Sequence, residues 1–571
     1  MAHIRTKKEL YERELTPAEE QLIEACQKGE FCQLGDGELP PEGTPDPSRH
    51  VRADVLRYLI LGGCDDCIVD DIGVWVEGAH VTGTLDLDFT TTRGAIRMHN
   101  SRFKERIDCE QTKCRQLDLN GSDLQGLRGQ AMKVTGNVFL QEITTHATID
   151  LRSATIGGQL NCKKATFEVA EKAEPEASEI FALKAQGANV TGGVFLGEIT
   201  THATIDLKRA TIAGQLNCEK ATFEVAKGRA LSAQDANVTG GAFLEKITTN
   251  ATIDLNSTTI GGQLNCTKAT FEVEVDHAVN AQDAKINGGL IWREATVIKS
   301  TLSFANAHTS VLCDDESSWP SGGRVDLNGM TYDTIIGGPL DAKTRLAWLD
   351  KGSNWNGEFK PQPYTQLAKV LRAMGHDSDA RQVLEKRDAL LLKSYRKNLR
   401  KLSETTKNAT ASHLATKSLA AAHWLFVDKL LGTLTGYGHQ PFRSLRFLFL
   451  LMFLAAIPSH MAWTFGGFTP NSAVIQVSDD WKALSNTENA AEEWSSKTQA
   501  GRDWETFQAV AYATDLVIPI INIGQTDAWA PSTTRGAAGY HMWWLSWVFT
   551  IVGWIVTALG AAAITGVIRR D

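Results

Sequence analysis

The chain has 571 residues, of which 43% are hydrophobic and 22% charged, and its formal net charge is −9. This composition excludes a disordered, collagen-like or disulfide-dense protein. The negative net charge argues against general nucleic-acid binding, and a mean hydropathy of −0.19 argues against a transporter with many membrane spans. Length alone suggests about four domains, but internal repeats merge much of the chain into one.

Residues 1–74 are expected to form an N-terminal helical cap. Thr16, Pro17 and Glu19 follow the N-cap, N1 and N3 pattern of a helix start. The apolar run Val55–Gly63 is typical of a second helix that glycines end. The first residues lack the apolar stretch of a signal peptide, so we expect a cytosolic segment with reduced thiols.

Two of the ten cysteines, Cys64 and Cys67, have the spacing of half a zinc site. A second pair is missing downstream, so no metal is expected. A redox CxxC lacks its usual thioredoxin-like surroundings. Two thiols in a loop are the simplest interpretation, and no other motif predicts a cofactor.

Repeats fill the middle of the chain. ITTHATIDL begins at Ile143 and Ile199 and returns as ITTNATIDL at Ile247, with offsets of 56 and 48 residues. The longer offset predicts a surface insertion at Glu171–Phe181. Within the repeats, apolar residues alternate with period two between Gly and Asn, which is typical of strands. A strand about every 11 residues, in coils of about 24, fits a parallel β-solenoid.

We therefore expect a mainly β protein in which residues 75–345 form one cytoplasmic parallel β-solenoid of about eleven pentapeptide-like coils. At ~4.8 Å per stacked strand it would be ~50 Å long. Ile205 and Leu216 occupy alternating apolar positions on neighbouring strands and should point inward. The exposed edges of the end coils require caps.

Two repeat positions carry side chains that often bind metals. One holds Cys162, Cys218 and Cys266; the other holds His146, His202 and Asn250. Intervening coils would keep the three cysteines apart, so we interpret them as a stack of small apolar side chains. A metal-binding histidine would not be replaced by Asn at the same position of another repeat. We therefore interpret these residues as side chains of the repeat without a metal-binding role.

Residues 346–442 are expected to form a basic helical connector. The pattern predicts a helix hairpin around Gly375. Between Lys360 and Leu402 there are eleven Lys or Arg and four Asp or Glu. A solvated helix face would explain this excess. Because membrane helices follow, we favour contact with anionic lipid headgroups, at ~1 kcal/mol per basic residue. Few aromatic residues accompany the charges, which disfavours nucleic-acid binding.

Residues 443–571 are expected to form a membrane module. Its two predicted transmembrane helices, Phe447–Phe465 and Met542–Ile568, are each long enough to cross a bilayer. The loop between them, 467–541, holds nine acidic and four basic residues. Basic residues lie at the outer ends of the pair: Arg443, Arg446, Arg569 and Arg570. Positive flanks predict cytoplasmic termini and an extracytoplasmic loop.

The apolar run Ala509–Ile523 within this loop is too short to span a membrane and is interrupted by Asp515 and Pro519. We expect a re-entrant-like segment at 505–530. An amphipathic helix packed on the two spans is the plainer interpretation. Asp515 could line a cavity, pair with Arg535 or face water.

His460 lies two residues after Pro458 in the first predicted span. An ionisable residue in a span is a functional candidate. A neutral His bonded to a carbonyl freed by the proline is the alternative.

The order of span, short helix, glycine loop and span resembles the pore module of two-helix cation channels. In that family an F-x-x-x-x-Y helix leads into a TVGYGD-type filter. Phe507 and Tyr512 match the helix, and Pro531 matches the residue after the filter. The resemblance makes pore-loop candidates of Asp515, Asn522, Gly524, Gln525 and Asp527. The filter region here lacks the second glycine, so potassium selectivity does not carry over.

Nearly the whole chain also resembles a bacterial family often labelled membrane-associated oxidoreductase or membrane protein. The matching motifs are VRADVL at Val51–Leu56, VTGTLDL at Val81–Leu87, the hairpin Gln362–Arg381, GYGHQPFR at Gly436–Arg443 and DLVIPIINIGQ at Asp515–Gln525. The resemblance implies a bacterial inner membrane. No motif of an oxidoreductase accompanies the label.

The leading interpretation is a non-enzymatic inner-membrane protein whose solenoid binds an unknown protein partner or acts as a scaffold. An oligomeric channel gated by the solenoid is the alternative, and a redox enzyme is a weaker one. The sequence leaves homo-oligomer formation open.

Overall fold

The computed structural model describes residues 3–169, 179–274, 277–320, 322–352, 354–355, 358–405, 418–419 and 422–566. It contains two compact units, Met1–Asp379 and Ala380–Asp571. Most of the predicted insertion at Glu171–Phe181 lies outside the described residues, as do Arg569 and Arg570.

Three helices begin the first unit: α1 (Lys7–Tyr11), α2 (Pro17–Lys28) and α3 (Ala53–Ile60). The predicted start of α2 is confirmed, because the Thr16 side chain and the Glu19 side chain form a reciprocal capping box. A two-stranded hairpin, β3 (Gly63–Cys64) and β4 (Cys67–Ile68), follows α3.

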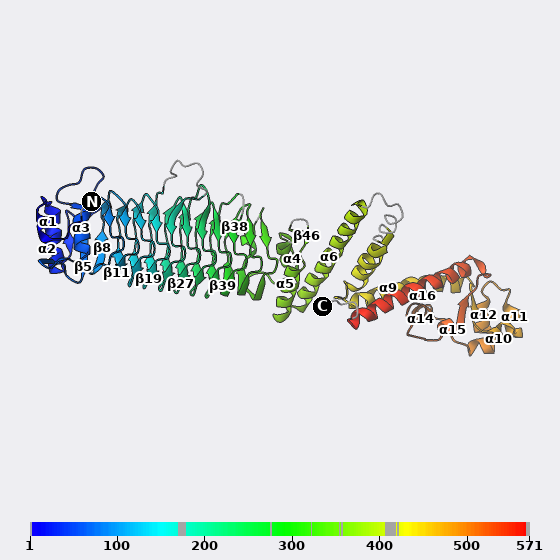
Figure 1. Cartoon of the computed structure of the whole chain (residues 1–571). Helices are drawn as coiled ribbons and strands as arrows, with labels where there is room; N and C mark the ends of the chain where they lie inside the picture. The colour runs from blue at the N-terminus through cyan, green and yellow to red at the C-terminus, as the bar shows by residue number, and fades with distance from the viewer. Residues whose placement is uncertain are drawn as a thin grey trace. The chain divides into compact units, whose positions relative to one another are not determined.

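A parallel β-solenoid follows, as the sequence predicts, with about eleven turns between residues 73 and 336 (Figure 1). Two of its sheets have eleven strands each among the described residues. The first contains β7 (Leu85–Asp86), β10 (Ile107–Asp108), β14 (Leu127–Arg128), β18 (Ile149–Asp150), β22 (Phe181–Lys184), β26 (Thr204–Asp206), β30 (Arg229–Ser232), β34 (Thr252–Asp254), β38 (His277–Asn280), β41 (Thr301–Ser303) and β43 (Arg324–Asp326). The second contains β2 (His50–Arg52), β6 (His80–Thr82), β9 (Arg102–Phe103), β13 (Asp123–Leu124), β17 (Thr144–Thr145), β21 (Thr166–Phe167), β25 (Thr200–Thr201), β29 (Thr222–Phe223), β33 (Thr248–Thr249), β37 (Thr270–Phe271) and β40 (Thr296–Val297).

The third sheet has twenty strands in the described part of the chain, and most coils contribute two neighbouring strands to it. Its strands are β1 (Cys32–Gln33), β5 (Gly73–Glu77), β8 (Ala95–His99), β11 (Lys113–Cys114), β12 (Leu117–Asp118), β15 (Lys133–Val134), β16 (Val138–Phe139), β19 (Thr155–Ile156), β20 (Leu160–Asn161), β23 (Asn189–Val190), β24 (Val194–Phe195), β27 (Thr211–Ile212), β28 (Leu216–Asn217), β31 (Asn237–Val238), β32 (Ala242–Phe243), β35 (Thr259–Ile260), β36 (Leu264–Asn265), β39 (Lys285–Trp292), β42 (His308–Asp314) and β44 (Thr331–Ile336).

A typical coil thus has four short strands, more than the spacing of about one strand per 11 residues predicts. Every second corner carries a residue with left-handed backbone, such as Glu142 (φ 56°), Ser153 (φ 55°) and Lys164 (φ 59°). These residues recur at the predicted spacing. Bends between them, such as Gly157–Gly158, divide each interval into two strands.

Side chains of alternate residues fill the interior of the solenoid. Ile205 and Leu216 are buried, which confirms their predicted inward direction. Phe167 pairs with Thr201, and Thr201 with Phe223, so large and small side chains alternate from coil to coil. Cys162, Cys218 and Cys266 are also buried, and burial raises the pKa of each thiol. Leu196 and Leu244 lie between them, in the register of the intervening coils.

The last coil is closed by the 3-10 turn η1 (Glu316–Ser318) and the helix α4 (Ala342–Asp350). The buried guanidinium of Arg345 on α4 makes two 2.7 Å hydrogen bonds to the carboxylate of Asp314. The Trp319 indole N–H also donates to that carboxylate, at 3.0 Å. Burying this ion pair is tolerable because the carboxylate is fully hydrogen-bonded. The short strands β45 (Asn354–Trp355) and β46 (Glu358–Phe359) and the helix α5 (Gln362–Ala373) complete this unit.

The second unit is helical. After α6 (Asp377–Thr405) come the π-helix η2 (Trp424–Leu431) and α8 (Gly432–Thr435). The long helices are α9 (Phe442–Thr464) and α16 (Gly536–Ile564). Between them lie α10 (Ala473–Gln476), α11 (Asp479–Leu484), α12 (Ala490–Lys497), α13 (Gln499–Arg502), α14 (Ala509–Val517), α15 (Gln525–Ala528) and the paired strands β47 (Phe468–Pro470) and β48 (Trp529–Pro531).

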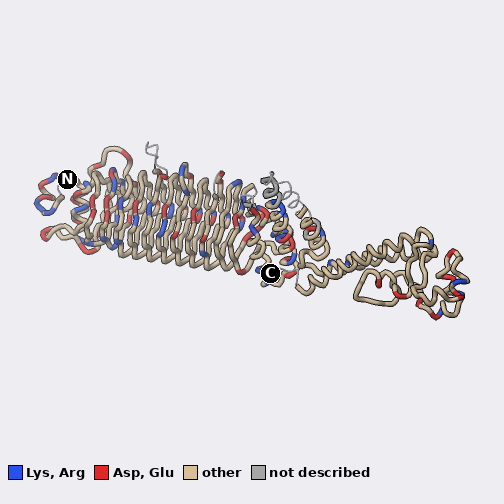
Figure 2. Tube along the Cα trace, turned by 45° about the vertical axis from the view of Figure 1, so that its right-hand side comes forward, with Lys and Arg blue, Asp and Glu red and all other residues tan. Residues whose placement is uncertain are grey.

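Two helices of the described residues, α9 and α16, are long and apolar enough to cross a membrane, and only 22% of the apolar window of each is buried. Figure 2 shows both helices with almost no charged residues along their length. Small residues let them approach closely. An added Cβ at Gly560 would lie 2.6 Å from the Ser444 hydroxyl oxygen.

Candidate functional site

The short helix α14 enters between α9 and α16. Tyr512, near its start, shares a buried cluster with Ala462 and Met542, which lie near the end of α9 and the start of α16. Ala513 and Val517 share another cluster with Ala455, near the middle of α9. Each turn along α14 therefore lies deeper between the two long helices. The amphipathic helix that was the plainer interpretation of this segment is present, packed between the two long apolar helices.

The backbone turns back directly after α14. The Ile521 amide donates to the Ile518 carbonyl at 3.1 Å, which closes a tight turn. The chain then runs to Gln525, where α15 begins. Residues 509–527 thus form the short helix α14, a tight turn and a loop that runs back toward the start of α14 (Figure 1). We call residues 518–524 the return loop.

Asp515 holds the return loop against α14. Its carboxylate accepts the backbone N–H groups of Ile523 at 2.5 Å, Gln525 at 2.7 Å and Thr526 at 3.2 Å. Pairing with Arg535, one of the three possibilities left open for Asp515, does not occur, because that guanidinium donates to the Ser485 carbonyl and lies over Trp481. The three amides supply the partners that a carboxylate in an apolar segment requires.

Gln525 closes the other end of the loop. Its side chain is buried. The amide nitrogen donates to the Thr506 carbonyl at 2.9 Å and to Glu505 at 3.1 Å, and the amide oxygen accepts the Gln508 N–H at 2.9 Å. The end of the loop therefore lies beside the segment that leads into α14.

Polar groups of the loop organise its exposed turn. The Asn522 amide nitrogen donates to Asp527 at 3.0 Å, and its oxygen accepts the Gly524 N–H at 2.8 Å. Gly524 has φ +92°, a conformation that favours glycine. Asp527 is exposed. All five pore-loop candidates predicted from the sequence therefore lie in one compact element.

The tip of the return loop is unusually exposed and apolar. The side chains of Ile520, Ile521 and Ile523 are 82%, 43% and 47% exposed. Their carbonyl oxygens accept no hydrogen bond from any donor in the described part of the chain. The tip combines apolar side chains with free backbone acceptors.

Aromatic side chains pack around the start of α14. Phe507 stacks on Trp463, with ring centroids 4.4 Å apart, and Tyr512 meets Phe468 edge to face at 5.1 Å. Trp529 packs against Trp463 at 4.8 Å. The two residues matched to a pore helix, Phe507 and Tyr512, thus anchor α14 in a rigid cluster.

His460 stays outside this network. Its side chain is exposed on α9, and it makes no hydrogen bond within the described residues. The adjacent Ser459 instead donates to the Ala455 carbonyl at 2.8 Å. The bond between His460 and a carbonyl freed by Pro458, one of the two alternatives for this residue, is therefore absent from the described structure.

Ion pairs tie α6 to the segment that leads into α9. Glu385 accepts from Arg443 at 2.6 Å, and Arg396 pairs with Asp428 at 3.1 Å. His439 is buried with its Nε2 atom 2.9 Å from Asp388. Three exposed lysines lie elsewhere on α6: Lys386, Lys393 and Lys397. The glycines of the GYG triplet form only the turn between α8 and α9.

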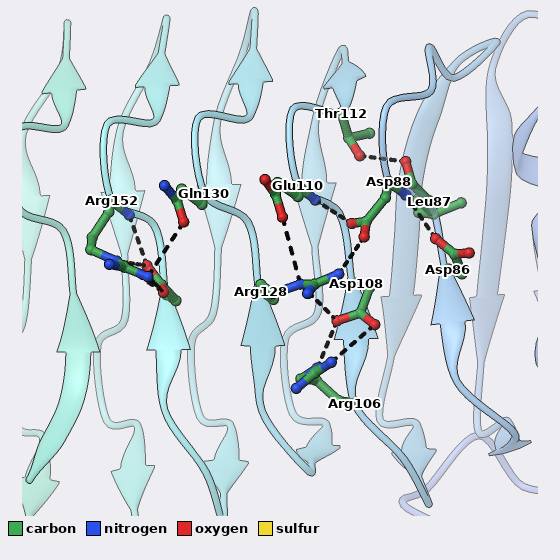
Figure 3. A network of polar contacts seen from close by, with 11 residues as sticks. Asp86, Leu87, Asp88, Arg106, Asp108, Glu110, Thr112, Arg128, Gln130 and Arg152 are labelled. Carbon is green, nitrogen blue, oxygen red and sulfur yellow. Dashed lines mark hydrogen bonds and ion pairs between the residues drawn. The ribbon is translucent and has the colours of Figure 1, made fainter.

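The charged face of the solenoid is largely paired within itself (Figure 3). Asp108 accepts from Arg106 at 2.6 Å and forms an ion pair with Arg128 at 3.3 Å. Arg128 also donates to Asp88, which lies two coils away. His146 similarly lies between two carboxylates. No group of three or more His, Cys, Asp or Glu suited to a metal ion occurs among the residues described.

Comparison of the chain with protein-family models, with curated proteins and with solved structures gave no match. Both resemblances stated from the sequence therefore stay expectations.

Sequence reasoning located the return loop but missed how it is held. The roles of Asp515 and Gln525 were not foreseen. One signal points to them: a carboxylate and a carboxamide in an otherwise apolar stretch must find hydrogen-bond partners nearby. The amides of 523–526 become available because the chain reverses at Ile518–Ile521.

Proposed function

We propose that this is a membrane protein in which several copies assemble around their return loops and enclose a water-filled path for cations. The observation that carries the proposal is the depth of non-helical backbone between α9 and α16. Val517 ends α14 against Gly553, which lies near the middle of α16. The return loop begins there.

Irregular backbone at membrane depth is tolerated only where protein buries it or where it lines a water-filled cavity. In a single chain the tip at Ile520–Ile523 is exposed and its carbonyls are free. Facing lipid, each free carbonyl would cost several kcal/mol, by the order-of-magnitude figure of ~2–7 kcal/mol for an unpaired amide group. Neighbouring copies, or water held between them, remove this cost.

A preference for cations follows from the charges. Asp527 is exposed beside the return loop, and residues 467–541 hold nine acidic and four basic residues. Rings of carboxylates attract cations at the mouth of a pore. No potassium selectivity is proposed, because the second glycine of that filter is missing.

The proposed orientation places α6 and the solenoid in the cytoplasm of a bacterium and residues 467–541 outside the inner membrane. Arg443 and Arg446 at the start of α9 support it. Lys386, Lys393 and Lys397 would then lie on the cytoplasmic side, where anionic headgroups attract lysines. The ion pairs of α6 to residues 428–443 offer a mechanical connection to the first span.

A non-enzymatic anchor for a partner-binding solenoid is the second candidate. One observation favours it: the buried side chains of α14, such as Ala513 and Val517, are fully covered within one chain. The module can then fold without neighbours. In this case the return loop would lie at a wet interface.

Conductance of the reconstituted full-length protein in planar bilayers distinguishes the two candidates. The pore predicts a cation current that Asp527→Lys reduces or makes anion-selective. Asp503→Asn, at an exposed carboxylate after α13, is the matched control and should leave the current unchanged. Silent bilayers at confirmed incorporation, across voltage and pH, would refute the pore and leave the anchor.

A further inference from the structure

Two cysteines face each other in the N-terminal cap. Cys64 ends β3 and Cys67 begins β4, and these residues pair directly across an antiparallel hairpin with a two-residue turn. Paired antiparallel residues have Cα atoms about 4.5–5.5 Å apart. That separation lies inside the range of about 4.4–6.8 Å that a disulfide spans. The backbone therefore already brings the two residues within bonding reach.

The Tyr58 hydroxyl contacts the sulfur of Cys64. It donates to the Cys64 Sγ atom at 3.0 Å, and the nearby Cys67 thiol contributes to the raised pKa of Tyr58, after burial and Cys64. The Gln27 amide nitrogen donates to the Cys67 Sγ atom at 3.1 Å. Residues directly opposite each other on antiparallel strands have their side chains on the same face, so the two sulfurs point to the same side of the hairpin.

The two thiols have different surroundings. Cys64 is half-buried, whereas Cys67 is 1% exposed. The Cys64 sulfur accepts hydrogen bonds from the Tyr58 hydroxyl and from the backbone N–H groups of Asp66, Lys7 and Cys67, and these bonds lower the pKa of that thiol. A thiolate that is reachable and hydrogen-bonded is the nucleophilic form of cysteine. Cys64 is therefore suited to attack an incoming disulfide, and Cys67 to form the protein disulfide in a second step.

Cys26, Cys32 and Cys313 lack these features. Cys26 and Cys32 are buried, and burial raises the pKa of Cys26 to about 12 and that of Cys32 to about 11. Such thiols are inert at neutral pH. Cys313, on β42, is half-buried like Cys64, but it lies opposite Ile291 and Ile336 in its sheet and has no cysteine as its cross-strand partner.

We propose that Cys64 and Cys67 form a reversible dithiol–disulfide pair that exchanges with low-molecular-weight disulfides. The Cys64 thiolate attacks one sulfur of the disulfide, forms a mixed disulfide and releases one thiolate. Cys67 then loses its proton, attacks the Cys64 sulfur and releases the second thiolate. Two protein thiols are oxidised to one disulfide, and one small disulfide is reduced to two thiols. This site does not depend on the pore.

The test uses the full-length reduced protein and oxidised glutathione, followed by intact mass and peptide mapping. We expect loss of two hydrogen atoms and a linked Cys64–Cys67 peptide, reversed by a reductant. Cys67→Ser should stop at one glutathione adduct on Cys64, and Cys64→Ser should leave Cys67 unmodified. Tyr58→Phe should slow the first step by roughly three- to tenfold, because it removes a thiolate hydrogen bond. Cys313→Ser is the control and should react like the parent.

Two results would overturn the proposal. One is a parent protein that keeps all ten thiols while an unstructured cysteine peptide in the same tube is fully oxidised. The other is a disulfide that links Cys67 to Cys26, which would make Cys64 a bystander. If Cys64→Ser fails to fold, the Cys67→Ser variant still tests the proposal, because the residue that carries its glutathione adduct is the attacking cysteine.

Discussion

Gly553 of α16 lies so close to the carbonyl oxygen of Val517 that an added Cβ atom would be 2.1 Å from that oxygen. The contact joins the end of α14 to a long apolar helix. Its closeness explains why the return loop begins between the helices rather than beside them.

This contact makes Gly553→Ala a test of the depth of α14. The added methyl group must push Val517 away, and overpacking of this kind costs about 1–3 kcal/mol. We expect a lower unfolding midpoint of the purified protein in detergent. Ala558→Val, on an exposed part of the same helix, should stay within about ±0.5 kcal/mol of the parent. Equal midpoints for parent and Gly553→Ala would mean that α14 does not reach this depth.

Asp515→Asn should loosen the return loop. An uncharged amide has one acceptor oxygen, so it cannot replace the carboxylate that binds three N–H groups. Hydrogen bonds to charged groups contribute about 1.5–3 kcal/mol each. Hydrogen exchange of the Ile523, Gln525 and Thr526 amides should accelerate. Asp479→Asn, at an exposed carboxylate on α11, should leave their exchange unchanged; if it accelerates them equally, Asp515 does not hold the loop.

Acid should weaken the first coil of the solenoid through His80. The side chain is buried on β6, and its Nε2 atom has no partner within the described residues. Burial, followed by the charges of Lys104, Arg102 and His50, lowers its pKa to about 4. The unfolded chain, with a pKa near ~6.5, takes up the proton first. The stability that neutral His80 contributes is therefore complete above pH ~6.5 and is lost as the pH falls toward 4.

Protection factors of the β2, β6 and β9 amides measure this effect. They should fall between pH 7 and pH 5 in the parent protein. The fall should shrink in His80→Leu and persist in His308→Gln, which changes an exposed histidine. Protection that is independent of pH in the parent would show that His80 takes up its proton while the first coil of the solenoid is folded.

The proposed orientation is tested at Ser496, which is exposed on α12. The native cysteines all lie between Cys26 and Cys313, so Ser496→Cys adds a single thiol to the membrane module. A membrane-impermeant maleimide should label it on intact cells. Labelling only after lysis would place residues 467–541 in the cytoplasm and reverse the orientation.

The solenoid was predictable because burial imposes period two on every strand, as Ile205 and Leu216 illustrate. Its four-strand coils were not, because the corner residues Glu142 and Lys164 adopt left-handed backbone without being glycine. No residue type marks such a corner.

The candidate site was predictable in position but not in construction. The motif around Asp515 and Gly524 located the return loop. The amides that bind Asp515 come from residues eight to eleven positions later, and only the reversal of the chain brings them close. In the cap, the spacing of Cys64 and Cys67 could be found in the sequence, whereas the hydrogen bond from Tyr58 to Cys64 depends on how α3 packs.

The central claim is that return loops of different copies meet. Disulfide cross-linking of Ile520→Cys in native membranes tests it most directly, because Ile520 is 82% exposed at the loop tip. We predict a covalent dimer that forms rapidly with a mild oxidant, while Val474→Cys, 78% exposed on α10, stays monomeric. A monomeric Ile520→Cys protein, with its thiol still reactive toward a maleimide, would contradict assembly around the return loop.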